Sequence, residues 1–291
     1  MPEVKKAIIL GAGLGTRFLP LSKIVSKELW PLVDRPLIQY LIQELKSSDI
    51  NQIIFILSPE KKELLSYFKK APILEKILRA KKDDKALVEL QNLQDLQKGI
   101  SIASIFQKKP LDNGHAILQA KEKIGKEPFA VLFCDDIIDS KVPAVLQLLN
   151  VFKTCQRPIV ALSRVPKEKV SAYSMVEVEK IAHKLYKIKK IVEKPAPNQI
   201  QSDLAIVGKY ILTPEFFDYL KLQKPNKKDE ITLAEALDTY LRDGKVIYGC
   251  ELEGKWLECG NKLDWLKSNI WLSLKHPQFG EELRRYLKEI T

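Results

Sequence analysis

The chain has 291 residues, of which 45% are hydrophobic and 29% are charged, a composition typical of globular rather than disordered proteins. No stretch approaches the roughly 20 apolar residues that cross a bilayer, and the first apolar segment is too short for a secretion signal. We therefore expect a cytoplasmic protein with no membrane partner. The four cysteines, Cys134, Cys155, Cys250 and Cys259, show neither zinc-ligand nor disulfide spacing.

The formal net charge of +11 raises the question of an anionic partner, either a nucleic acid or a small phosphorylated substrate. The lysines are spread over several segments and lack the interleaved aromatic residues that stack on RNA bases. No helix-turn-helix, RNA-recognition or zinc-finger pattern is present. We predict no nucleic-acid partner and attribute most of this charge to solvated lysine faces.

In the first quarter of the chain, short apolar runs alternate with segments of helical spacing. Residues 6–10 and 53–57 are apolar runs that predict buried strands. Residues 36–45 carry apolar side chains at helical spacing after a proline suited to a first turn, and residues 61–70 predict a second helix. This alternation favours a parallel sheet with helices on both faces.

The same alternation continues to the end of the chain. Predicted strands lie at residues 102–106, 129–133, 158–164, 175–179, 188–193, 205–212 and 246–252. Predicted helices lie at residues 71–96, 114–123, from 214 onward, 230–241, 263–274 and 279–290. Without a repeat or a low-complexity linker, we expect one domain over residues 1–274. Residues 275–291 then form a C-terminal helix available for an oligomer contact.

The glycine-rich turn after the first strand reads Gly11-Ala-Gly-Leu-Gly-Thr-Arg17. Glycines at this place let the backbone approach a ligand and point N–H groups at phosphate oxygens. The spacing does not match a dinucleotide-binding fingerprint, and no Walker lysine follows. Arg17, together with Lys27 downstream, instead suits a triphosphate, because both side chains neutralise phosphate charge.

Gly13-Leu-Gly-Thr-Arg17, followed by Lys27 and the segment 31–40, resembles the bacterial UTP–glucose-1-phosphate uridylyltransferases, also called UDP-glucose pyrophosphorylases. The resemblance extends from residue 6 to about residue 274. It implies the α/β fold of nucleotide-diphospho-sugar transferases, which has a Rossmann-like mixed, mostly parallel central sheet flanked by helices. It also implies a homodimer or homotetramer.

The resemblance further implies a Mg²⁺-dependent reaction in which UTP and glucose 1-phosphate give UDP-glucose and pyrophosphate. The catalytic residues would be Arg17, Lys27 and Asp135. The nucleotide would be bound by Ala12, Gly13, Leu14, Gly15, Thr16, Gln107, Gly114 and His115. Transfer of this kind needs little acid–base catalysis, because the attacking phosphate is already ionised.

Asp135 and Asp136 directly follow the predicted strand 129–133, and ligands of open α/β sheets bind beyond the carboxyl ends of strands. Mg²⁺ prefers one or two carboxylates together with phosphates and water. By resemblance, Asp135 and Glu258 would bind the metal. The sugar phosphate would be bound by Asp136, Ser174, Glu193 and Lys194.

Several positions depart from the pattern of the family. Glu258 stands where the second metal ligand is usually an aspartate, Ser174 where a glycine follows the tyrosine, and Ser26 where a proline precedes the lysine. We expect Ser26 to loosen the loop that carries Lys27. Thr232, Ala234 and Glu235 also replace the usual residues. These departures leave open a weakly active or regulatory paralogue, or a transferase for a different sugar 1-phosphate or base.

Overall fold

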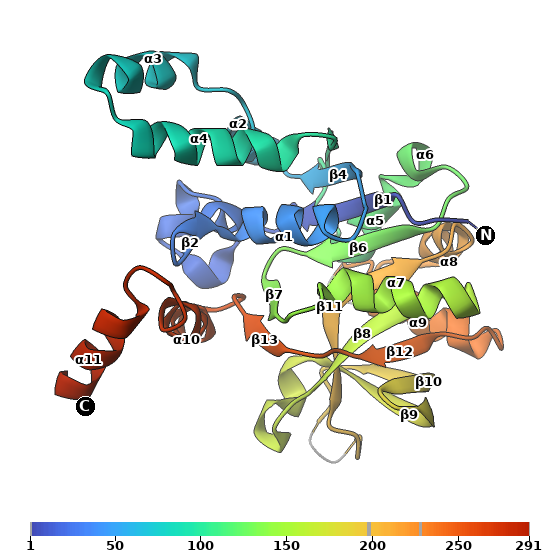
Figure 1. Ribbon diagram of the computed structural model, residues 1–291. Helices are drawn as coiled ribbons and strands as arrows, with labels where there is room; N and C mark the ends of the chain where they lie inside the picture. Colours follow the sequence, from blue (N-terminus) through green and yellow to red (C-terminus); the bar gives the residue numbers. More distant parts are fainter. Residues whose placement is uncertain (1, 197–198, 227–228, 291) are drawn as a thin grey trace.

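A nine-stranded sheet with helices on both faces forms the body of the protein (Figure 1). The computed structural model describes residues 2–196, 199–226 and 229–290. The strands lie in the order β5 (Ser101–Phe106), β4 (Gln52–Leu57), β1 (Lys6–Gly11), β6 (Phe129–Phe133), β11 (Leu204–Leu212), β8 (Ile159–Arg164), β12 (Tyr248–Glu251), β10 (Leu185–Glu193) and β9 (Ser174–Ala182).

The sheet is mixed, and the expectation that it is mostly parallel is not confirmed. The strands β5, β4, β1 and β6 are parallel, whereas β11 is antiparallel to β6, β8 and β9. Because β9 pairs with both β10 and β11, the second half of the sheet closes into a small barrel. The connections explain the difference: helical crossovers allow parallel neighbours, whereas the two residues between β9 and β10 allow only an antiparallel hairpin.

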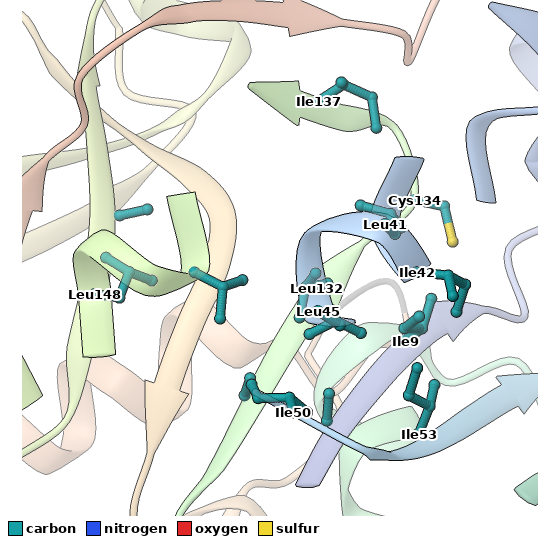
Figure 2. Packing of buried hydrophobic residues seen from close by; sticks show 14 of the residues in the cluster. Ile9, Leu41, Ile42, Leu45, Ile50, Ile53, Leu132, Cys134, Ile137 and Leu148 are labelled. Carbon is teal, nitrogen blue, oxygen red and sulfur yellow. The ribbon is translucent and has the colours of Figure 1, made fainter. Parts of the chain in front are cut away.

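Two hydrophobic cores lie on the two faces of the sheet, as the alternation of side chains along each strand requires. On one face Ile9 and Leu132 pack with α1 (Leu37–Lys46) and α7 (Ala144–Cys155). Figure 2 shows the α1 side chains Leu41 and Leu45 above this part of the sheet. On the other face the adjacent strand residues pack with α5 (Asp112–Leu118), α8 (Phe216–Leu222) and α9 (Leu233–Arg242). The predicted helices on both faces are therefore confirmed, and α7 is an element that was not predicted.

Some predicted helices are divided. Residues 61–70 begin at the end of the 3-10 helix η4 (Pro59–Lys61) and contain the short helix α2 (Glu63–Ser66), and residues 114–123 fall in α5 and α6 (Lys121–Ile124). Residues 71–96 form two helices, α3 (Pro72–Lys81) and α4 (Asp84–Gln97), which project from the body together (Figure 1). The break occurs because Lys82 is left-handed, with φ of 55°, and the Asp83 side chain caps α4 by accepting a hydrogen bond from the Ala86 N–H.

The C-terminal part leaves the sheet through a small two-stranded ribbon, in which β13 (Lys255–Glu258) pairs with β7 (Asp136–Asp139). The helices α10 (Lys262–Ser273) and α11 (Gly280–Ile290) follow it and lie at the lower left of Figure 1. A second ribbon joins β2 (Pro31–Leu32) to β3 (Arg35–Pro36). Within the described ranges, no helix combines the length and the apolar character needed to cross a bilayer.

A buried ion pair ties β11, α1 and α7 together on the face of the sheet that α1 covers. The Lys209 side chain, on β11, is fully buried, and its Nζ lies 2.8 Å from Oε2 of Glu44 on α1. The other oxygen of Glu44 accepts a hydrogen bond from the Val145 N–H in the first turn of α7. Because both charges are removed from water, each depends on the other to remain stable there.

Replacing one partner should therefore destabilise the fold strongly. We expect Lys209→Met to lower the free energy of unfolding by about 3–5 kcal/mol, because Glu44 would remain buried without its counter-charge. Urea denaturation measures the loss, and Lys190→Met, at an exposed position of β10, is the matched control. A loss no larger than that of the control would show that Glu44 is stable without Lys209.

Candidate active site

The carboxyl ends of the parallel strands bring the predicted site residues to one edge of the sheet. Gly11 at the end of β1 pairs with Leu57 at the end of β4, which pairs in turn with Phe106 at the end of β5. Phe133, at the end of β6, pairs with Leu10 of β1. The residues that follow these ends, among them Ala12, Gln107 and Asp135, therefore start from neighbouring places, as expected for a ligand site of an open α/β sheet.

The glycine-rich turn adopts a conformation that requires one of its glycines. Gly15 is left-handed, with φ of 66°, and a Cβ atom there would lie 3.3 Å from Cβ of Ser22. Gly13, in contrast, has open space around it, and Leu14 is exposed. The 3-10 helix η1 (Thr16–Phe18) follows and carries Arg17. The turn thus leaves its backbone at Gly13 open to a ligand.

Arg17, Lys27 and Asp135 come together at this edge, although more than 100 residues separate the first two from the third. Nζ of Lys27 lies 2.7 Å from Oδ2 of Asp135, and both side chains are 16% exposed. A Cβ atom on Gly260, just after β13, would lie 3.1 Å from that same Oδ2 and 3.3 Å from Nη1 of Arg17. The absence of a side chain at Gly260 therefore leaves room for the acid and the arginine side by side.

The charges of this cluster stabilise one another. Burial alone would raise the pKa of Asp135, but the attraction of Lys27 outweighs it and leaves the pKa below its usual value. Burial alone would also lower the pKa of Lys27, and the carboxylates of Asp135 and Glu28 raise it instead. Both groups are thus charged near neutral pH. A pre-formed site with two cations beside one carboxylate suits a polyphosphate and a metal ion.

The loop that carries Lys27 is anchored on both sides of it. Lys27 begins the 3-10 helix η3 (Lys27–Leu29), and the neighbouring Glu28 is fully buried against Lys61 at 2.9 Å. Ser26 is buried as well, and its hydroxyl donates a hydrogen bond to the Glu63 carboxylate. The expectation that Ser26 loosens this loop is therefore wrong, because a hydrogen bond to α2 holds the residue in place.

The residues expected at the base lie near β5 and α5. Nε2 of Gln107 lies 2.8 Å from Nδ1 of His115 and 3.3 Å from the Asp112 carbonyl oxygen. Burial, followed by the charge of Lys109, lowers the pKa of His115, so its ring is neutral near pH 7. Gly114 donates its N–H to the Ile231 carbonyl oxygen at 2.9 Å, and a Cβ atom there would lie 2.7 Å from that oxygen. Close packing of two backbones therefore explains the glycine at position 114.

Asp136 and Glu258 face each other as cross-strand neighbours on β7 and β13. Asp136 accepts hydrogen bonds from the Trp256 indole N–H at 2.7 Å and from the Gly208 N–H at 3.1 Å. Burial, reinforced by the charge of Asp135, raises the pKa of Asp136 to about 7. Glu258 instead accepts a hydrogen bond from the Tyr173 hydroxyl, and burial raises its pKa.

The residues expected at the sugar phosphate lie where β9 and β10 meet. Ser174 begins β9 directly opposite Glu193, the last residue of β10, and its hydroxyl donates a hydrogen bond to the Glu193 carboxylate. Lys194 follows, with Nζ 3.4 Å from Oε1 of Glu193. Burial raises the pKa of the Tyr210 hydroxyl, and the charges of Asp136 and Glu193 raise it further.

The carboxylates of this site bear on whether it can hold a metal ion. In the part of the chain that the structure describes, no three His, Cys, Asp or Glu side chains gather in a way that would hold a metal ion. Asp135 is paired with Lys27, and Oε1 of Glu258 lies 3.5 Å from the Asn261 amide. Mg²⁺ accepts one or two carboxylates completed by substrate phosphates, so the residue types at positions 135 and 258 suit that ion.

Comparison with known proteins identifies the family. The family model described as nucleotidyl transferase matches residues 6–270. The chain belongs to this family. It is 38% identical over 290 residues to the UTP–glucose-1-phosphate uridylyltransferase of Staphylococcus haemolyticus, a match that covers 100% of this chain and 99% of the relative. The family expected from the sequence is therefore confirmed.

Two solved structures of related nucleotidyl transferases have the same fold. A UTP-bound UDP-glucose pyrophosphorylase from Acinetobacter baumannii is similar with a TM-score of 0.89 and 32% identity, covering 99% of this chain and 100% of that one. A UDP-glucose pyrophosphorylase complexed with UDP-glucose gives a TM-score of 0.83 and 33% identity, covering 94% and 100%. The mixed α/β fold is thus shared with enzymes whose structures hold the nucleotide and the nucleotide sugar.

Three residues of the site were not predicted from the sequence. Tyr173 and Trp256 contact the acids Glu258 and Asp136, and Gly260 makes room for Asp135 and Arg17. No spacing or composition signal distinguishes them, because their roles arise from the pairing of β13 with β7 and from the position of the barrel.

A substitution at Gly114 tests whether close backbone packing explains this glycine. We expect Gly114→Ala to lower the free energy of unfolding by about 1–3 kcal/mol, because the added methyl group would overlap the Ile231 carbonyl oxygen. Urea denaturation measures this loss. A variant as stable as the wild type would mean that the backbones at this contact separate freely, and that another requirement selects the glycine.

Proposed function

We propose that this protein transfers the uridylyl group of UTP to glucose 1-phosphate, releasing pyrophosphate. The observation that carries the proposal is the convergence of Arg17, Lys27 and Asp135 at the open edge beside Gly13. The names of the full-length relatives, and the UTP and UDP-glucose held by the similar structures, support the choice of substrates.

In this proposal the chain acts by positioning and charge rather than by proton transfer. An oxygen of the sugar phosphate attacks the α-phosphorus of UTP in line, and the bond to the pyrophosphate oxygen breaks. Arg17 stabilises the charge that develops on the leaving pyrophosphate. Lys27 gives up its ion pair with Asp135 and binds an α-phosphate oxygen instead. The attacking phosphate is already ionised, so no general base is needed and His115 takes no part in proton transfer.

Asp135 and Glu258 are the residues that would hold Mg²⁺. When bound, the ion would neutralise phosphate charge and so reduce the repulsion between two anionic reactants. The carboxylate of Asp135 is free to take this role once the phosphates draw Lys27 and Arg17 away from it.

The remaining predicted residues form two subsites in this proposal. The backbone at Ala12 and Gly13, followed by Leu14, Gly15 and Thr16, meets the nucleotide. The Gln107 amide pairs with the imide edge of uracil beside His115. The sugar phosphate lies against Ser174, Glu193 and Lys194, with Asp136 near the sugar. The rigid bond between Ser174 and Glu193 would orient the carboxylate that accepts the sugar hydroxyls.

Asp135 is the residue whose loss should affect the reaction most. We expect Asp135→Ala to reduce turnover of UTP and glucose 1-phosphate with Mg²⁺ by about a thousandfold or more, because charge stabilisation by a metal contributes several kcal/mol. Pyrophosphate release measures turnover. Asp139→Ala, on the same ribbon but bonded to Trp271 outside the cleft, is the matched control. Unchanged turnover in Asp135→Ala would remove this residue from the mechanism.

The same pyrophosphate-release assay shows which base and which sugar the protein uses. It also tests the alternative of a regulatory paralogue. Turnover is compared for UTP and dTTP, and for glucose and galactose 1-phosphates. Faster turnover with a different pair would identify another transferase of this family. No pyrophosphate release with any pair would favour a regulatory paralogue, to which the departures at Ser174 and Glu258 point.

We also propose that residues 1–274 form the catalytic domain of a cytoplasmic homodimer or homotetramer, and that the C-terminal helix contributes to subunit contact. Two apolar side chains on α11, Tyr286 and Ile290, are 54% and 59% exposed. Covering them would remove apolar surface from water.

Charge introduced on this face tests the oligomer proposal. We expect Ile290→Lys combined with Tyr286→Lys to lower the mass measured by light scattering to that of a single chain, because burial of two ammonium groups is costly. The matched control is Lys288→Ala on the same helix. A variant pair that keeps the wild-type mass would place the subunit contact elsewhere.

A further inference from the structure

Two aromatic side chains join the acids of the β7–β13 ribbon to one another. The rings of Tyr173 and Trp256 lie 4.9 Å apart between centroids. The Trp256 indole N–H donates to Oδ1 of Asp136 at 2.7 Å, and the Tyr173 hydroxyl donates to Oε2 of Glu258. Each ring therefore holds one carboxylate, and their contact links the two.

The backbone of Tyr173 also holds the turn that carries Lys194. The Lys194 N–H donates to the Tyr173 carbonyl oxygen at 3.0 Å. Lys194 is left-handed, with φ of 43°, a conformation that a residue with a Cβ atom adopts only when its surroundings impose it. Ser174, which follows Tyr173 in the chain, donates a hydrogen bond from its hydroxyl to the Glu193 carboxylate. The segment 173–174 thus fixes both residues of the proposed sugar-phosphate subsite.

The position of the Tyr173 hydroxyl depends less on packing than the positions of the ring and the backbone do. A cavity of about 500 Å³ borders Tyr173, Trp256 and Glu258, so solid core does not enclose the ring on that side. Lys169, from the 3-10 helix η5 (Lys167–Ala172), lies 3.7 Å from Oε2 of Glu258 and 3.0 Å from Asp264. On its other side the Tyr173 ring packs against the buried Val165, Val170 and Met175, so the bond to Glu258 is the contact that fixes its hydroxyl end.

We propose that Tyr173 is a positioning residue that couples the acids of the β7–β13 ribbon to the sugar-phosphate subsite. Glu258 accepts the bond from the hydroxyl with Oε2, while its Oε1 lies 3.5 Å from the Asn261 amide. Loss of the hydroxyl removes one of the contacts that hold the segment 173–174, so that Glu193 and Lys194 meet the sugar phosphate in a less fixed geometry. The nucleotide subsite at the glycine-rich turn is built on other elements and is unaffected. This inference rests on the function proposed above.

The test is Tyr173→Phe, which removes the hydroxyl and keeps the ring. We expect the KM for glucose 1-phosphate to rise about tenfold, the size typical of losing a hydrogen bond to a charged group, while the KM for UTP changes less than about twofold. Calorimetry without added metal should show the same split, with weakened binding of UDP-glucose and unchanged binding of UTP. Tyr186→Phe is the matched control, because Tyr186 donates a similar bond to Glu251, at 2.6 Å, from a barrel strand.

A double-mutant cycle tests whether the bond to Glu258 carries the effect. Glu258→Asp keeps the acid but shortens it by one methylene, so it should weaken UDP-glucose binding about as much as Tyr173→Phe. The two changes together should then weaken binding no further than either alone. Effects that simply add, or equal losses for UTP and UDP-glucose in Tyr173→Phe, would overturn the coupling.

The result also separates this inference from the function on which it rests. If the wild-type protein binds UTP and UDP-glucose and Tyr173→Phe binds both equally well, the coupling is wrong and the proposed function stands. If the wild-type protein binds UTP but not UDP-glucose, the proposed function fails and the coupling fails with it.

Discussion

Parallel strands end at a common edge, and the register of β1, β4, β5 and β6 brings the starting points of the glycine-rich turn, Gln107 and Asp135 to this edge. The glycine-rich turn follows β1, Gln107 follows β5 and Asp135 follows β6. A shift of one strand by a single residue would turn its side chains to the opposite face of the sheet and bury apolar residues against the wrong core. The two cores on the two faces therefore fix the positions of the groups at the candidate site.

The charged groups gathered at this edge must also be stable before a substrate brings its own charge. Asp135 is stabilised there by its ion pair with Lys27, and Arg17 lies nearby. The loop that carries Lys27 is anchored on both sides of it. Ser26 is hydrogen-bonded to Glu63, and Glu28 forms an ion pair with Lys61. Such a cluster loses little rotamer entropy when phosphates arrive, because the anchoring has already restricted the loop. The buried pair between Glu28 and Lys61 thus contributes to the site although neither group faces it.

Much of this arrangement could be predicted from the sequence, because the signals are local. The strand ending at Gly11, the helix α1 and the acids after β6 follow from apolar spacing and from the residues that end each element. The closed barrel could not be predicted, since it depends on the pairing of β9 with β11, which is a long-range contact without a local pattern. No element was expected at α7, although its buried residues Val145, Leu148 and Phe152 have helical spacing. The hydrogen bond of Ser26 to Glu63 was also out of reach, because periodicity does not identify polar partners far apart in the chain.

The departures from the family pattern are related through the structure, and they have to be interpreted together. Glu258 and Ser174 lie far apart in the sequence, yet the hydroxyl of Tyr173 contacts the first residue and Tyr173 directly precedes the second. A longer acid at position 258 reaches Tyr173, and a hydroxyl at position 174 holds Glu193. Each change alone would suggest a weakened site. Side by side they form one hydrogen-bonded unit across the cleft, so restoring a single family residue would break a contact without recreating the arrangement that it replaced.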